Sequence, residues 1–134
     1  MTTETADYAL GFDPVRRLVT IRATGFWNRA LLDRFGAELA AELRRVAGLG
    51  EPFGVLADAT DFPVQSIPIS LGFMDIVRRL DKDLLVPTAV LTRSVLLRLQ
   101  ALRVFVAPHI RTFGDADAAH EWLAEAIPAY WAHR

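Results

Sequence analysis

The segment DATDFPVQSIPIS contains four polar side chains that could take part in catalysis, ligand binding or modification: Asp58, Asp61, Ser66 and Ser70. The two aspartates follow a buried strand, and ligands bind open α/β sheets at the carboxyl ends of parallel strands. Two carboxylates three residues apart could bind a divalent cation or orient a hydroxyl group. Asp is also a favoured turn residue, because its carboxylate accepts a hydrogen bond from the backbone two residues ahead. A metal needs further oxygen ligands, which the sequence does not supply, so we favour the turn role and expect no metal.

The two serines stand where a helical pattern begins. A hydroxyl group there accepts a hydrogen bond from an unpaired backbone N–H and stabilises the helix by about 1 kcal/mol. The alternative is phosphorylation, since a phosphate at a helix N-terminus is favoured by the macrodipole and changes the charge of a docking surface. We favour capping, and we keep the more accessible Ser66 as the regulatory candidate; Ser70 is expected to be partly shielded.

The rest of the sequence offers no catalytic or cofactor-binding pattern. The absence of cysteine excludes thiolate catalysis, disulfides and Cys-ligated zinc. His109, His120 and His133 have no metal-binding spacing and are expected at the surface or at helix ends. GxSxG, P-loop and GxGxxG patterns are missing. We therefore predict a non-enzymatic protein without a cofactor and rank an enzyme that uses Asp58 or Asp61 last.

Length and charge restrict the class of protein further. The 134 residues suit one domain. Fifteen Lys and Arg against sixteen Asp and Glu give a net charge of -1, which argues against nucleic-acid binding. The acidic start MTTETADYAL does not resemble a secretory signal, and no apolar run approaches the roughly 20 residues of a membrane span. We expect a soluble, cytoplasmic protein with no stable membrane insertion.

Apolar periodicity predicts the elements that position these residues. Alternating side chains on either side of Asp13-Pro14 predict an antiparallel hairpin. Helical spacing predicts a helix over 29–47 that ends at Gly48. Further strands are predicted at 53–59, 87–92 and 111–113, and further helices at 66–80, at 95–107 after Ser94, and from Asp115 or Asp117 to Pro128. The aromatic tail 127–134, with Tyr130 and Trp131, is expected to fold back on the core or to meet a partner.

The resulting order is β-β-α-β-α-β-α-β-α. Such alternation predicts an α/β fold with a mostly parallel sheet, one antiparallel strand from the hairpin, and helices packed on the sheet. We interpret residues 1–134 as a single domain with an ordered core at about 8–126.

This order, the opening hairpin, the acid in GVLADATDF and the ending TFGDADAAHEWL together resemble the STAS superfamily, and more closely its SpoIIAA-like (STAS-like) branch. The resemblance covers residues 8–126. Members of the better-known branch are anti-sigma factor antagonists that share an Asp-Ser-Ser-Gly motif at the start of the second helix, where phosphorylation blocks partner binding. The matching segment here reads QSIPIS. The resemblance therefore implies a bacterial, cytoplasmic regulatory module that docks a protein through residues 58–70 and the second helix, more than it implies a phosphoswitch.

The second and third predicted helices carry more apolar residues than one core-facing stripe requires. The surplus residues are Leu71, Met74, Ile76, Leu96, Leu99 and Phe105. Another molecule should cover them. We predict a homodimer first, because closed homodimers are the commonest assemblies. A regulatory protein partner, or an apolar small molecule or lipid bound between these two helices, remains the alternative.

Overall fold

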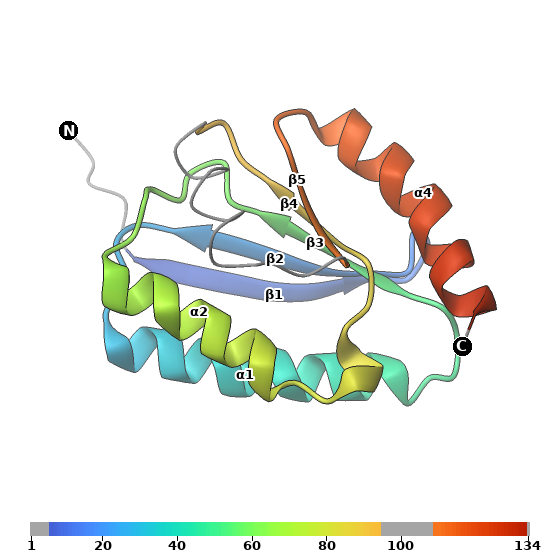
Figure 1. Ribbon diagram of the computed structural model, residues 1–134, viewed down its shortest axis with the longest axis horizontal. Helices are drawn as coiled ribbons and strands as arrows, with labels where there is room; N and C mark the ends of the chain where they lie inside the picture. The colour runs from blue at the N-terminus through green and yellow to red at the C-terminus, as the bar shows by residue number, and fades with distance from the viewer. Residues whose placement is uncertain (1–5, 95–108, 134) are drawn as a thin grey trace.

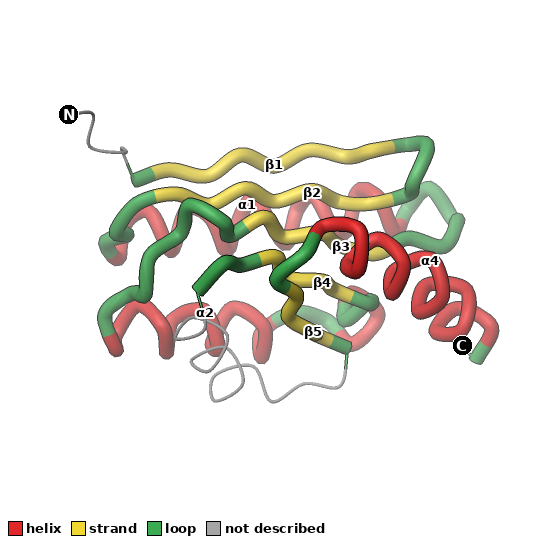
Figure 2. Tube along the Cα trace, turned by 90° about the horizontal axis from the view of Figure 1, so that it is seen from above, coloured by secondary structure: helices red, strands yellow, loops and turns green. Residues whose placement is uncertain are grey.

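The computed structural model describes residues 6–94 and 109–133 of the chain, and its centre is a five-stranded sheet in the order β1-β2-β3-β4-β5. Strand β1 (Asp7–Asp13) pairs antiparallel with β2 (Leu18–Thr24). The remaining neighbours are parallel: β3 (Gly54–Asp58), β4 (Thr88–Leu91) and β5 (Ile110–Phe113). Figure 2 shows the five strands side by side. The predicted fold class, including the single antiparallel strand, is confirmed.

Helices cover both faces of the sheet (Figure 1). Helices α1 (Arg29–Ala47) and α2 (Ile67–Arg79) pack on one face, and α4 (Ala116–Ala132) packs on the other. A 3₁₀ turn, η1 (Lys82–Leu84), leads from α2 towards β4. The helix predicted over 95–107 lies outside the described residues.

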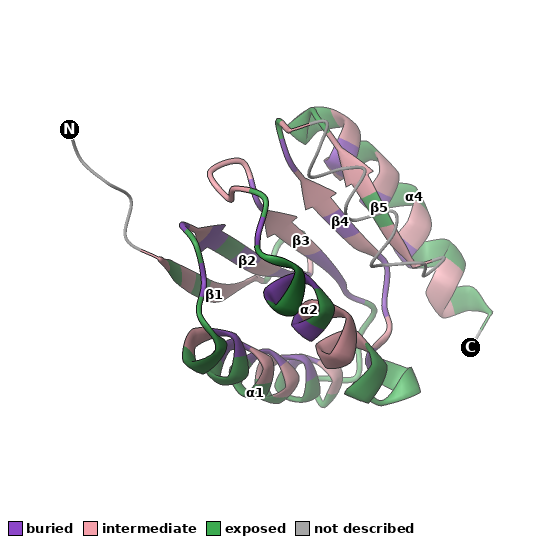
Figure 3. Ribbon diagram, turned by 60° about the vertical axis from the view of Figure 1, so that its left-hand side comes forward, coloured by how far each residue is buried: buried purple, intermediate pink, exposed green. Residues whose placement is uncertain are grey.

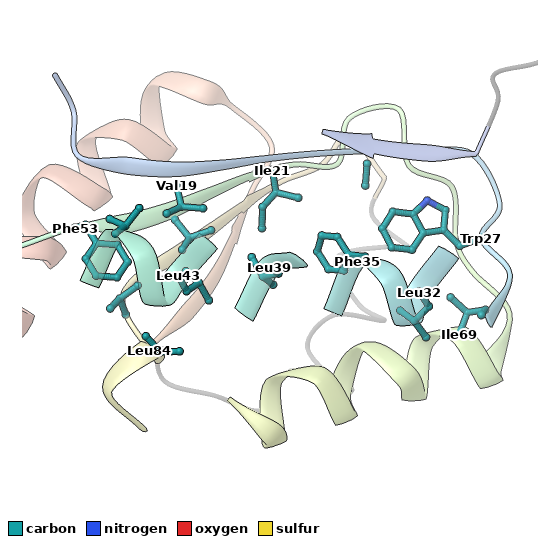
Figure 4. Close-up of a cluster of buried hydrophobic side chains, with 14 residues drawn as sticks. Val19, Ile21, Trp27, Leu32, Phe35, Leu39, Leu43, Phe53, Ile69 and Leu84 are labelled. Carbon is teal, nitrogen blue, oxygen red and sulfur yellow. The ribbon is translucent and has the colours of Figure 1, made fainter. Parts of the chain in front are cut away.

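Helix α1 begins and ends where its sequence pattern predicts. The Oδ1 of Asn28 accepts a hydrogen bond from the N–H of Leu31 at 2.9 Å, which satisfies one of the unpaired donors of the first turn. Five residues at helical spacing are buried against the sheet: Leu32, Phe35, Leu39, Leu43 and Val46. Figure 4 shows Leu43 and Leu39 below Val19 and Ile21 of β2, and Leu32 below Trp27 beside Ile69.

Helix α4 does not stop at Pro128, so the predicted helix end is wrong. The helix continues to Ala132 and places Trp131 beside Phe53, with ring centroids 5.6 Å apart. The indole N–H of Trp131 donates to the backbone oxygen of Phe53 at 2.9 Å. Proline removes one helical hydrogen bond and crowds the preceding turn, and these contacts together with the burial of Ile127 offset that cost. Tyr130 and Trp131 thus pack on the core, which was one of the two outcomes expected for the aromatic tail, but residues 127–132 belong to α4.

None of the helices in the described part of the chain has the length and apolar character that a membrane crossing requires.

Candidate docking surface and apolar cavity at the start of α2

Both aspartates of the 58–70 segment hold partners within the protein. The Oδ1 of Asp58 accepts hydrogen bonds from the N–H of Thr60 at 3.0 Å and from its hydroxyl group at 2.7 Å. Asp61 forms an ion pair with Arg22 at 2.9 Å. Within residues 6–94 and 109–133, no three His, Cys, Asp or Glu side chains gather as a metal site would require. The arrangement supports a turn at Asp58 and a tether to β2 at Asp61.

The two serines have different environments. Ser66 occupies the N-cap position of α2 and is exposed, whereas Ser70 is buried. The expected cap is absent, because the hydroxyl group of Ser66 makes no capping hydrogen bond. An N-cap hydroxyl normally accepts from the second or third residue of the helix, and the second residue here is Pro68, which has no N–H. The exposed hydroxyl group of Ser66 is therefore not committed to the helix start.

Gln65 joins this loop to the loop between β2 and α1. Its side chain is buried, and its Oε1 accepts from the N–H of Trp27 at 2.8 Å. Its Nε2 donates to the backbone oxygens of Gly25 at 3.0 Å and of Pro63 at 2.8 Å. One amide group thus fixes residues 25–27 against residues 63–65. We call this arrangement the Gln65 clamp.

Four apolar side chains on the two clamped loops and on the first turns of α2 are exposed to solvent. Their exposed fractions are 72% for Phe26, 39% for Val64, 74% for Ile67 and 48% for Leu71. The clamp holds the neighbours of Phe26 and Val64 together, and Ile67 and Leu71 share one helical face because they are four residues apart. Figure 3 shows the exposed side of α2 at its first turns. We call these four residues the docking patch.

The other predicted interface residues divide into three groups. Leu71 belongs to the docking patch, and Met74 is half-buried. Ile76 is half-buried as well, and it packs against the core where α2 crosses α1. Gly36 permits that approach, since a Cβ atom there would lie 3.0 Å from Cγ1 of Ile76. Leu96, Leu99 and Phe105 lie outside the described residues.

Beneath the docking patch lies an apolar cavity of about 170 Å³, between the sheet and helices α1 and α2. Its lining includes four aromatic rings, from Trp27, Phe35, Phe62 and Phe73. The ring of Trp27 is central to them, with centroids 5.1 Å from Phe35, 5.4 Å from Phe62 and 5.2 Å from Phe73. Figure 4 shows Trp27 and Phe35 side by side below the sheet. We call this space the aromatic cavity.

Tyr8 and His109 are among the titratable groups whose pKa values are shifted. Burial raises the pKa of Tyr8, and the hydrogen bond that its hydroxyl group donates to Glu38 acts in the same direction. The ring of Tyr8 packs against Trp27 and Phe35, at the edge of the aromatic cluster. Burial lowers the pKa of His109, which immediately precedes β5.

Comparison with solved structures identifies the fold. The structure matches an uncharacterized protein of the DUF3478 family from Shewanella loihica PV-4, which has a SpoIIAA-like fold, with a TM-score of 0.68. The two sequences are 18% identical, and the match covers 92% of this chain and 98% of the other. The chain has a SpoIIAA-like fold. An anti-sigma factor antagonist from Mycobacterium paratuberculosis matches with a TM-score of 0.56 and 10% identity, over 88% of this chain and 95% of that one. The SpoIIAA-like likeness expected from the sequence is thereby confirmed at the level of fold.

Sequence comparison adds nothing to this result: no family model and no curated protein matches the chain.

Sequence reasoning missed the Gln65 clamp, the docking-patch residue Phe26 and the aromatic cavity. Two local signals were present. Gln65 is a polar residue beside Ser66 in the mainly apolar stretch FPVQSIPI, and Ala57 and Ala59 are small residues at the end of a buried strand. Their significance depends on which distant residues lie opposite them, and that comes only from the fold.

Proposed function

We propose that this protein is a non-enzymatic regulatory module that binds a protein partner through the docking patch. The observation that carries the proposal is the exposure of Phe26, Val64, Ile67 and Leu71 on the two loops that Gln65 joins and on the first turns of α2. Scattered exposed apolar residues are ordinary, but a grouped set exposes apolar area that a partner can cover. The centre of a protein interface is typically apolar and includes aromatic side chains, which suits Phe26 with its three aliphatic neighbours.

The 58–70 segment supports the proposal because it carries Val64 and Ile67 of the docking patch and is itself held in place by side-chain contacts. The Asp58 turn, the Asp61–Arg22 ion pair and the Gln65 clamp fix its backbone at three points. A surface fixed in this way loses little conformational entropy on binding. The anti-sigma factor antagonist with a similar fold supports a regulatory protein as the partner.

Ser66 stays a candidate regulatory residue within this proposal. It is exposed, precedes Ile67 of the docking patch directly, and has a hydroxyl group that does not cap α2. A phosphate there would add nearly two negative charges beside an apolar surface, and desolvating them would oppose docking. Ser66→Glu should therefore weaken partner binding, whereas Ser66→Ala should leave it unchanged.

Quantitative co-purification from the cells that naturally produce the protein tests the proposal. Wild-type protein is compared with a patch variant, Ile67→Asp/Leu71→Asp, and with a control, Val15→Asp/Leu49→Asp. The control replaces two apolar residues that are also exposed but lie elsewhere, in the β1–β2 turn and after α1. Circular dichroism first establishes that both variants fold.

The expected result is a defined partner protein that the wild type and the control retain and that the patch variant loses. A set of bound proteins that is the same for all three chains would refute docking through this patch. The predicted homodimer stays a separate prediction: light scattering measures the molar mass of the same three chains. A dimer that only the patch variant disrupts would assign the patch to self-association instead.

A further inference from the structure

The aromatic cavity is a second candidate site, and it is distinct from the exposed docking patch. Its walls come from one face of the sheet and from the inner faces of α1 and α2. The sheet side of the described lining consists mainly of small and β-branched residues: Ile21, Ala23, Ala57, Thr88, Val90 and Ile110. The helix side supplies Phe35, Leu39, Phe73, Ile76 and Val77.

The space exists because alanines stand where larger core residues would fill it. Ala23 of β2 and Ala57 of β3 lie on the face towards α1 and α2, and Ala59 follows β3. Ala57 pairs with Ile21 on one side and with Val90 on the other, so it lies between two branched side chains. Protein interiors are normally packed to the density of organic crystals. We therefore attribute the volume of about 170 Å³ to the small side chains at these alanine positions.

Three of the four polar side chains in the described lining form hydrogen bonds within the protein, and the fourth, Ser70, is buried in α2. The amide of Gln65 bonds three backbone groups, and the hydroxyl group of Thr88 donates to the backbone oxygen of Val86 at 2.9 Å. The Oδ1 of Asp58 accepts both of its hydrogen bonds from Thr60. A ligand in this space would meet aromatic rings, methyl groups and methylene groups. It should be neutral and without strong hydrogen-bonding groups, because burying such groups unpaired is costly.

The volume sets the size of the ligand. Apolar cavities of about 150 Å³ can stay free of water and bind benzene. The three phenylalanine rings around Trp27 meet its ring at interplanar angles between 40° and 74°, and such tilted contacts suit a further aromatic ring packed edge to face. We propose that the aromatic cavity binds a compact, neutral, apolar molecule the size of a single aromatic ring. The proposal goes beyond partner docking and does not depend on it.

Toluene is the probe, and calorimetric titration of the full chain with toluene and with benzoate measures the affinity. Benzoate has a similar ring but carries a charge, so it should not bind. Methyl NMR spectra locate the site: the methyl groups of Ile21 and Ile76 line the cavity and should shift, whereas those of Leu18, which packs towards α4, should not.

Filling the cavity should abolish binding. Ala57→Leu places a larger side chain in the space and is expected to weaken toluene binding by about tenfold or more. Ala47→Leu is the matched control, since Ala47 also packs against the core but does not line the cavity. If Ala57→Leu does not fold, the smaller change Ala57→Val takes its place.

Saturable toluene binding that shifts Ile21 and Ile76, that excludes benzoate and that Ala57→Leu weakens would establish the site. Absence of saturable binding up to the solubility of toluene would overturn the proposal, because the space would then be filled by the chain itself or too small. Binding that persists equally in a folded Ala57 variant would also overturn it. Neither result depends on whether the docking patch has a partner.

Discussion

Replacing Gln65 by methionine tests whether the clamp organises the start of α2. Methionine has a similar length and shape but cannot make the three hydrogen bonds to Trp27, Gly25 and Pro63. Each hydrogen bond contributes about 1 kcal/mol net, and buried groups that lose their partner cost somewhat more. The N–H of Trp27 and the oxygen of Gly25 belong to buried residues. We therefore expect Gln65→Met to lower the free energy of unfolding by about 3 kcal/mol.

Urea denaturation followed by circular dichroism measures this free energy. For a chain of this length the same loss should lower the melting temperature by about 10 °C. Ser66→Met is the matched control, because it places the same side chain on the neighbouring exposed residue and breaks no side-chain cap. Its expected effect is below about 0.5 kcal/mol.

Amide hydrogen exchange distinguishes the clamp from simple packing. If Gln65 holds the loop, the N–H of Trp27 should exchange faster in folded Gln65→Met than in the wild type. A loss of stability below about 1 kcal/mol would refute the clamp, since one hydrogen bond alone would account for it. Unchanged protection of the Trp27 N–H in the folded variant would refute it as well.

Three further changes have defined outcomes. Asn28→Ala removes a real side-chain cap and should cost about 1 kcal/mol in urea denaturation, whereas Ser66→Ala, at an N-cap without such a bond, should cost almost nothing. Gly72→Ala should destabilise despite the better helix propensity of alanine, by about 1 kcal/mol, because the new Cβ would lie 2.1 Å from Cδ2 of Leu32. Burial lowers the pKa of His109 below 6.5, so the unfolded chain binds more protons than the folded chain as the pH falls. The wild type should therefore lose stability between about pH 7 and pH 5, and His109→Gln should lose less.

Each of these has a contradicting result. Equal losses for the two cap variants would show that Ser66 does support the helix. A stabilised Gly72→Ala would show that Leu32 moves aside at little cost. Identical pH dependence of unfolding in the wild type and in His109→Gln would show that His109 titrates alike in the folded and unfolded chains.

Elements whose pattern is local were predictable from the sequence. Helix α1 has a complete apolar stripe, a capping Asn28 and a terminal glycine, and it has the predicted bounds. The hairpin has strict alternation around Asp13-Pro14 and forms as predicted. The end of α4 was not predictable in this way, because Pro128 is a strong local stop signal. The contacts that carry the helix past it involve Phe53, which is 78 residues from Trp131 in sequence.

The candidate site was predictable only in outline. The polar residues of the 58–70 segment pointed to the loop before α2. Leu71, which the sequence analysis counted among the apolar residues beyond the core-facing stripe, is exposed. The sequence pattern could not show that Ile76 is packed, because that depends on Gly36 of another helix. Nor could it show that Phe26 joins the surface: Phe26 and Val64 are brought together by hydrogen bonds of Gln65 to residues about 40 positions away.

In the two loops at the start of α2, consecutive residues face opposite ways. Phe26 and Val64 are exposed to solvent, whereas their neighbours Trp27 and Gln65 line the aromatic cavity. The docking patch and the aromatic cavity are therefore formed in part by the same stretches of backbone. A mutation that changes how the interior is filled will also shift the residues that face outward. Natural variation at Ala57 or Phe73 should consequently be accompanied by variation at Phe26, Val64 or Leu71, and homologous sequences should display these positions changing together.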